Sequence, residues 1–404
     1  MKTNILNAGY DSNLRISKGR GQFLYDKNNK KYLDLSMCSG TMILGYSSKI
    51  FNKAIDKQKK IGSLFGLPNN YADQYSKILK KIFPQYSKFI LSSSGAEANI
   101  RAIRIARSLT NKDTIVMVSG SWHGSVDSLL FDLKDNKKRT LSSGIAKYYK
   151  KNLIIVPYNK YVKSEKILKK HKSKIALVII EPIQQYLPTA ISEKYIKQIF
   201  NFCKKNNILI CFDEMITGMR IKNFSVQQKL KLNPDISTFG KIFGGGIPIG
   251  ITAISKKVEK KLKNRKIFLG GTYSANPLSV YVGLKTVEFI LKNKDKFYNK
   301  INHLAEYFVK DLNNFLISNN FKIRVYNYYT MSRLVFSDKQ IYNREERDNS
   351  EKNFKNKIVK FKKYVQSKNI VHPSIGAYFF SYTHELSDIK RLLRVFKAGI
   401  KKIF

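Results

Sequence analysis

The middle of the chain alternates short apolar runs with segments of helical periodicity. Largely apolar runs predict strands at residues 114–118, 175–180, 208–212 and 236–239, and residues 88–91 predict a fifth strand. Runs of this length without alternating polar positions are typical of strands that are buried on both faces. The alternation therefore indicates βαβ units in a doubly wound, mainly parallel sheet.

A helix is predicted directly after the strand at 88–91, from about residue 96 to residue 109. Arg101, Arg104 and Arg107 point away from its apolar face. That face is formed by Ala98, Ala102, Ile105, Ala106 and Leu109.

The sequence changes character after about residue 285, where long amphipathic segments at 285–293 and 302–317 are accompanied by few strands. We expect a large domain over residues 46–285 and a smaller α+β domain over residues 286–404. Residues 1–45 are expected to join the smaller domain.

Polar residues follow three of the predicted strands at the points where they end. Glu181 follows the strand at 175–180, Asp213 follows the strand at 208–212, and Lys241 comes two positions after the strand at 236–239. Ligands of doubly wound sheets bind outside the carboxyl ends of the strands. We therefore expect these three side chains to meet in one crevice.

Lys241 and Asp213 are candidates for chemistry. Lys241 precedes a triple glycine, Gly244–Gly246, where a ligand or backbone can approach closely. A lysine desolvated there would have a lowered pKa and could act as a Schiff-base amine, although most lysines are ordinary surface charges. Asp213 could be capped by backbone N–H groups, or it could pair with a cation such as the protonated ring nitrogen of pyridoxal phosphate.

Two further turns follow predicted strands. Residues 93–96 begin a helix, and backbone N–H groups at a helix N-terminus favour a phosphate, although many βα turns look similar. Trp122 and His123 follow the strand at 114–118. Trp122 could be a core residue or an aromatic platform for a flat ring, and His123 alone is more often structural.

Composition narrows the class of protein. With 404 residues, 43% hydrophobic and 25% charged, the chain is globular rather than fibrous or disordered. The net charge of +47 invites a nucleic-acid interpretation, but the basic residues are scattered and no zinc-finger or RNP-like motif is present. Residues with A/T-rich codons are abundant, so we interpret the charge as genomic base bias acting on solvated surfaces.

The cysteines and the hydropathy indicate a soluble, cytoplasmic protein. Cys38, Cys203 and Cys211 form no CxxC spacing, which argues against a zinc site or a redox dithiol, and we predict no metal. Cys203 and Cys211 lie in apolar contexts that are typical of core positions. No apolar run approaches the roughly 18 residues of a membrane helix, and the start of the chain lacks the apolar region of a signal peptide.

Together and in this order, the motifs resemble the class III aminotransferases, pyridoxal-phosphate enzymes of fold type I. Within that family the chain looks most similar to glutamate-1-semialdehyde 2,1-aminomutase, through Thr217-Gly218-Met219-Arg220 and Met42-Ile43-Leu44-Gly45. The family motifs are matched by Ser94-Gly95-Ala96-Glu97-Ala98, Trp122-His123-Gly124, Glu181-Pro182, Asp213-Glu214, Gly240-Lys241 and the segment 271–277.

The resemblance implies a three-layer αβα large domain, a smaller α+β domain and a role for each matched residue. Lys241 would form the Schiff base with pyridoxal phosphate and move a proton, and Asp213 would pair with the ring nitrogen. Trp122, in its motif with His123, would stack on the ring, Met215 would pack behind it, and Glu181 would be a further polar contact.

The resemblance also implies how the phosphate and the substrate are held. Ser94, Gly95 and Ala96 would bind the phosphate through backbone N–H groups. Thr272 of the partner subunit would complete that site in a homodimer with shared active sites. Arg15 could bind a substrate carboxylate, although an ordinary surface arginine is at least as consistent with its context.

The sequence departs from the family at several positions. Ala96 stands where Thr or Ser is usual, and the segment between Arg15 and Gly21 is about ten residues shorter than in the aminomutases. The aminomutase's active-site glutamate falls near Gly376, which has no carboxylate.

Three functions follow. The first is an aminotransferase that moves an amino group from a donor such as glutamate to a small aldehyde or ketone. The second is an aminomutase that forms 5-aminolevulinate within one substrate. The third, a basic binding protein without catalysis, would require the motifs to be vestigial, and we expect neither specific nucleic-acid nor membrane binding.

Overall fold

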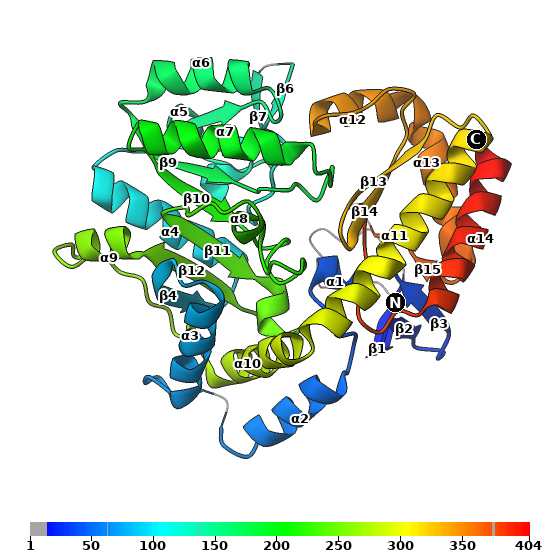
Figure 1. Cartoon of the computed structure of the whole chain (residues 1–404), viewed down its shortest axis with the longest axis horizontal. Helices are drawn as coiled ribbons and strands as arrows, with labels where there is room; N and C mark the ends of the chain where they lie inside the picture. Colours follow the sequence, from blue (N-terminus) through cyan, green and yellow to red (C-terminus); the bar gives the residue numbers. More distant parts are fainter. Residues whose placement is uncertain (1–13, 63, 136, 374–375) are drawn as a thin grey trace.

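The computed structural model describes residues 14–62, 64–135, 137–373 and 376–404, and its architecture is shown in Figure 1. A seven-stranded sheet has the order β4-β12-β11-β10-β9-β5-β8. Neighbouring strands from β11 to β8 are parallel, whereas β12 runs antiparallel to both β11 and β4. The strands are β4 (Tyr86–Ser92), β5 (Thr114–Val118), β8 (Leu153–Val156), β9 (Ile175–Ile180), β10 (Leu209–Asp213), β11 (Ile236–Gly240) and β12 (Gly250–Ser255).

The five predicted strands are all present. The bounds of β5 and β9 agree with the prediction, and those of β4, β10 and β11 differ by one or two residues at an end. The antiparallel β12 was not predicted. It follows the triple glycine and lies between β11 and β4, pairing with both.

Helices cover the sheet, and their ends follow local capping residues. The Ser94 hydroxyl accepts a hydrogen bond from Glu97 N and begins α4 (Gly95–Thr110), as predicted. The helix α10 (Pro277–Lys292) begins eight residues before the predicted residue 285, because Asn276 caps it and Pro277 suits its first turn. The other helices of this region are α2 (Lys49–Gln58), α3 (Asn70–Ile82), α5 (Lys147–Lys151), α6 (Tyr161–His171), α7 (Ser192–Lys205), α8 (Val226–Lys229) and α9 (Lys256–Leu262).

The two ends of the chain meet in the first of two smaller sheets. One has the order β1-β2-β3-β15 and joins β3 to β15 in parallel, and the other has the order β13-β14-β16. Their strands are β1 (Ile16–Arg20), β2 (Phe23–Asp26), β3 (Lys31–Asp34), β13 (Arg324–Tyr328), β14 (Met331–Val335), β15 (Ile370–Val371) and β16 (Ala377–Phe379). Figure 1 shows the long helix α11 (Lys294–Ser318) beside α13 (Lys355–Ser367) and α14 (Leu386–Ile403). The domain boundaries at residues 45 and 285 stay a prediction.

Three further elements lie close to the central region. They are the short turn α1 (Met37–Gly40), the hairpin β6 (Phe131–Lys134) with β7 (Lys137–Thr140), and the helix α12 (Arg344–Glu351). Cys203 and Cys211 are buried, as predicted, in the apolar layers on the two faces of the sheet. In the part of the chain that the structure describes, no helix is long and apolar enough to cross a membrane.

Candidate active site

A cavity of about 370 Å³ lies at the carboxyl ends of the central strands. It brings together residues that the sequence separates by up to 211 positions, from Cys38 to Ile249. Nine of the sequence-predicted site residues line it: Ser94, Gly95, Ala96, Trp122, His123, Glu181, Asp213, Met215 and Lys241.

Lys241 follows β11 directly and is partly buried in the cavity wall. Its backbone has a φ of 49°, a left-handed conformation that is uncommon outside glycine and that aims the side chain away from the line of the strand. Removal from bulk water lowers the pKa of Lys241, and the positive charge of Arg220 adds to this effect. The charges of Asp213 and Glu181 oppose the shift.

Asp213 is buried, and both of its carboxylate oxygens accept hydrogen bonds. Oδ2 lies 2.7 Å from His123 Nδ1 and 2.9 Å from Asn99 Nδ2, and Oδ1 lies 3.1 Å from Met215 N. Asn99 is itself oriented by Thr238, whose hydroxyl donates to Asn99 Oδ1 over 2.7 Å. These donors stabilise a carboxylate in a fixed orientation beside the cavity.

Glu181 is a second buried carboxylate of the cavity. It accepts hydrogen bonds from Trp122 N at 3.2 Å and from Gln185 N at 3.3 Å. Burial, together with the neighbouring charge of Asp213, raises the pKa of Glu181 to about 8. Glu181 therefore ties two cavity loops together and changes charge near neutral pH.

The N-terminus of α4 opens into the same cavity. The N–H groups of Gly95 and Ala96 have no hydrogen-bond partner among the described residues, because the Ser94 hydroxyl caps Glu97 N instead. A Cβ at Gly95 would lie 2.8 Å from Met215 Sδ, so a larger residue there would require the Met215 side chain to shift. Free N–H groups at the start of a 16-residue helix form an anion site.

Thr272 and Arg15 are not brought to the cavity of this chain. Thr272 is exposed in the loop between α9 and α10, and Arg15 is exposed just before β1. Arg101 holds the Thr272 loop, since its Nη2 lies 2.9 Å from both Gly270 O and Ser274 Oγ. Arg101 lies off the apolar face of α4, as predicted, but it is only 3% exposed because this loop covers it.

Sequence reasoning missed several residues that line or support the cavity. Asn99 could have been found, since it falls on the apolar face of α4 three residues before Ala102. Cys38 and Thr41 reach the cavity from α1, and Gln185 reaches it from the loop after β9. Arg220 is buried behind α1 and donates to Gly40 O over 2.6 Å. None of these four directly follows the last residue of a strand, and Arg220 was quoted within a family motif without a role in the site.

The described residues fit pyridoxal phosphate. The free N–H groups of Gly95 and Ala96 suit its phosphate, the oriented Asp213 suits a protonated ring nitrogen, and Lys241 supplies an amine with a lowered pKa. Ala96 lacks a hydroxyl, so at that position only the backbone can contact the phosphate.

Comparisons with known proteins agree with this assignment. The sequence profile of the aminotransferase class-III family matches residues 5–331. The chain is 33% identical to glutamate-1-semialdehyde 2,1-aminomutase of Archaeoglobus fulgidus over 76% of each protein. It is 31% identical to the protein of the same name from Wigglesworthia glossinidia brevipalpis over 96% of this chain and 91% of that protein.

Solved structures share the fold. An omega-transaminase from Sphaerobacter thermophilus superimposes with a TM-score of 0.89 at 20% identity, covering 99% of this chain and 93% of that one. A glutamate-1-semialdehyde aminomutase from Pseudomonas aeruginosa, in complex with PMP, gives 0.87 at 17% identity over 97% and 88% of the two chains. The predicted α/β fold of pyridoxal-phosphate transferases is confirmed. Since the profile covers 327 of the 404 residues, the chain belongs to the class-III aminotransferases, a family of pyridoxal-phosphate-dependent enzymes.

Proposed function

We propose that the protein moves an amino group from glutamate to a small aldehyde or keto compound, with Lys241 as the amine that attaches to the cofactor. The observation that supports this most is the convergence of three groups on one cavity. They are a desolvated lysine, an aspartate held by three donors, and two free backbone N–H groups.

Each group has a chemical task. Pyridoxal phosphate, when bound, supplies an electron sink for the carbon that carries the amino group. Asp213 would hold the proton on the ring nitrogen, and its own donors Asn99 and His123 keep it in place. Ser94, Gly95 and Ala96 would hold the phosphate, while Trp122 and Met215 would line the ring.

Lys241 would also carry the proton. Because its pKa is lowered, Nζ loses its proton more readily than a surface lysine does. Nζ can then take a proton from the substrate carbon and return it at a neighbouring position as a general base and acid.

The second part of the proposal is a homodimer in the cytoplasm. Thr272 is exposed and lies outside the cavity of its own chain, so it is available to a neighbouring subunit. The nearby Phe268 and Tyr273 are 75% and 63% exposed, an amount of apolar surface that a partner would cover. The three cysteines are unpaired, which suits a reducing compartment.

A glutamate-1-semialdehyde 2,1-aminomutase is the second candidate, because the curated relatives carry that name. Gly376, near the position of the aminomutase glutamate, argues against it. Its φ is 75°, and a Cβ there would lie 2.9 Å from Arg333 Nη1, so any side chain at this position would strain the backbone and require Arg333 to shift. The role of Arg15 toward a substrate carboxylate stays a prediction.

One experiment distinguishes the aminotransferase from the aminomutase. The enzyme loaded with pyridoxal phosphate is incubated with glutamate and small aldehydes, and formation of 2-oxoglutarate is followed. Turnover that needs both compounds supports the aminotransferase. Formation of aminolevulinate from glutamate-1-semialdehyde without any donor would replace it by the aminomutase.

A further inference from the structure

Trp122, the only tryptophan of the chain, lies in the wall of the cavity and is 37% exposed. On the side of the sheet, Glu181 accepts a hydrogen bond from Trp122 N over 3.2 Å. On the other side, residues 119–121 form the turn that leads into Trp122. A shift of this turn would therefore move the Trp122 ring relative to the cavity.

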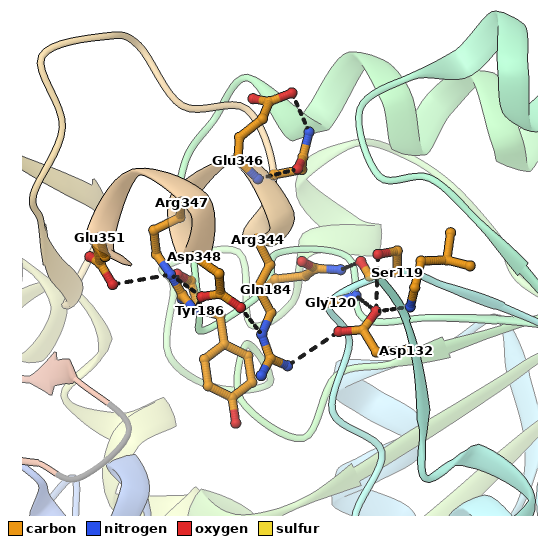
Figure 2. A network of polar contacts seen from close by, with 12 residues as sticks. Ser119, Gly120, Asp132, Gln184, Tyr186, Arg344, Glu346, Arg347, Asp348 and Glu351 are labelled. Carbon is orange, nitrogen blue, oxygen red and sulfur yellow. Dashed lines mark hydrogen bonds and ion pairs between the residues drawn. The ribbon is translucent and has the colours of Figure 1, made fainter. Parts of the chain in front are cut away.

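One buried carboxylate binds the turn of residues 119–121. Asp132 Oδ1 accepts hydrogen bonds from Ser119 Oγ at 3.0 Å and from Gly120 N at 2.9 Å. Its other oxygen, Oδ2, lies 3.6 Å from Nη1 of Arg344 in α12, as Figure 2 shows. Among the described residues, Arg344 is the only basic side chain that forms an ion pair with Asp132. A buried carboxylate is costly without a cation, so the conformation of this turn depends on Arg344.

Arg344 lies directly against the turn and is itself held in place. Gly120 has a φ of 82°, and a Cβ there would lie 2.9 Å from Arg344 Cβ, so the turn and α12 approach each other closely. Arg344 Nε lies 3.4 Å from Asp348 Oδ2, and the guanidinium group lies 4.3 Å from the centre of the Tyr186 ring (Figure 2). These contacts orient the guanidinium group toward Asp132.

The helix α12 is attached to the rest of the chain by other contacts as well. Arg347 Nη1 donates to Tyr186 O over 2.6 Å, and Lys160 Nζ lies 3.1 Å from Glu346 Oε1. The particular consequence of the ion pair is therefore at the turn before Trp122. Since α12 follows β14, which belongs to a separate sheet, the ion pair links Trp122 to a part of the chain outside the seven-stranded sheet.

We propose that Arg344 is a positioning residue which, paired with Asp132, holds residues 119–121 so that the Trp122 ring stacks on the ring of pyridoxal phosphate. An aromatic ring that is fixed before the ligand arrives binds it at a lower entropic cost. The inference rests on the proposed function, in which Trp122 lines the cofactor ring. It adds a residue of α12, outside the cavity, to the groups on which cofactor binding depends.

The test uses the fluorescence of Trp122, to which no other tryptophan contributes. Emission of the full chain is recorded while pyridoxal phosphate is added, and the titration gives both the affinity and the final quenching of the Trp122 ring. In Arg344→Ala the affinity should fall about two- to tenfold, the range expected for one aromatic stacking contact, and the quenching should be less complete. Asn349→Ala, at an exposed position of the same helix, should change neither.

Further variants assign the effect to the ion pair rather than to a general loss of structure. Asp132→Asn removes the charge but keeps an oxygen that can accept from Ser119 and Gly120, so it should lower the affinity in the same direction, and it carries the test if Arg344→Ala does not fold. The double variant Arg344→Ala/Asp132→Asn should lose no more affinity than the more affected single variant, because both changes remove the same contact. Arg344→Lys keeps the charge without the planar group and should recover part of the affinity. Urea unfolding shows whether each variant is folded.

The outcomes separate the inference from the function on which it rests. Wild-type affinity and quenching in both Arg344→Ala and Asp132→Asn, or additive losses in the double variant, would overturn the inference while amino transfer stands. Cofactor binding without any amino transfer would overturn the proposed function, whereas the affinities of the variants would still decide the role of Arg344. Failure of pyridoxal phosphate to quench Trp122 in the wild type would overturn the stacking, and the inference with it.

Discussion

The two sides of the site are built differently. On the Lys241 side, Asp213 is buried and all of its donors come from the same chain. On the other side, which we call the loop side, Thr272 lies in an exposed loop whose backbone carbonyls accept hydrogen bonds from Arg101 and Arg104 of α4.

This difference indicates which part of the site one chain forms by itself and which part depends on a partner. A buried, fully hydrogen-bonded group is held before any ligand arrives, so it can orient a cofactor at little entropic cost. An exposed loop gains its order and its role from contact with something else, which we propose to be a second subunit. We expect a single chain to hold the cofactor through Lys241 and Asp213, and we expect the Thr272 loop to need a second subunit.

The largest effect is expected at Lys241. Lys241→Ala removes the amine and the proton carrier, and steady-state turnover should fall by about 10³-fold or more. Lys260→Ala removes an exposed lysine of α9 and should leave turnover unchanged. Full turnover in Lys241→Ala would refute its assignment.

Asp213→Asn keeps the size of the side chain but removes its charge. Loss of a charge-assisted contact should weaken pyridoxal-phosphate affinity by about 10- to 150-fold, measured by absorbance titration. Asn99→Ala, which removes one of the donors to Asp213, should have a smaller effect in the same direction. If Asp213→Asn binds the cofactor as the wild type does, the Lys241 side does not hold the cofactor as proposed.

The loop side is tested by adding charge. Phe268→Asp and Tyr273→Asp would place a carboxylate in the proposed interface, and each should weaken the dimer by about tenfold or more and lower turnover. Light scattering after size exclusion gives the oligomeric state. Val162→Asp is the control, because Val162 is 80% exposed on α6. A fully active monomer would show that the loop needs no partner.

The smallest effect concerns the pH dependence of stability. The pKa of Glu181 is raised from 4.5 to about 8, so between these values the folded chain binds more protons than the unfolded chain. Glu181 therefore makes the folded state less stable as the pH rises through this range, by up to about 1.4 kcal/mol per pH unit. Glu181→Gln should lose this slope in urea unfolding at pH 5, 6.5 and 8, and identical slopes would contradict the shift.

The Lys241 side was largely predictable from the strand pattern, whereas the role of Thr272 on the loop side came only from the resemblance and stays a prediction. Residues at the ends of β9, β10 and β11 must meet at one edge of a parallel sheet, so strand patterns alone brought Glu181, Asp213 and Lys241 together. Gln185 and Arg101 depend on how loops fold back, which no periodicity encodes. The position of β12 could not be predicted from the sequence either, because its apolar residues do not reveal whether the strand runs parallel or antiparallel to its neighbours.

The central claim is that the cavity of Lys241 and Asp213 holds pyridoxal phosphate for amino transfer. The most direct test is the visible absorbance spectrum of the protein with pyridoxal phosphate, recorded before and after glutamate is added. The account predicts a yellow band from the cofactor bound to Lys241, which is absent in Lys241→Ala and disappears as the pyridoxamine form accumulates. Absence of any band, even after excess pyridoxal phosphate, would contradict it.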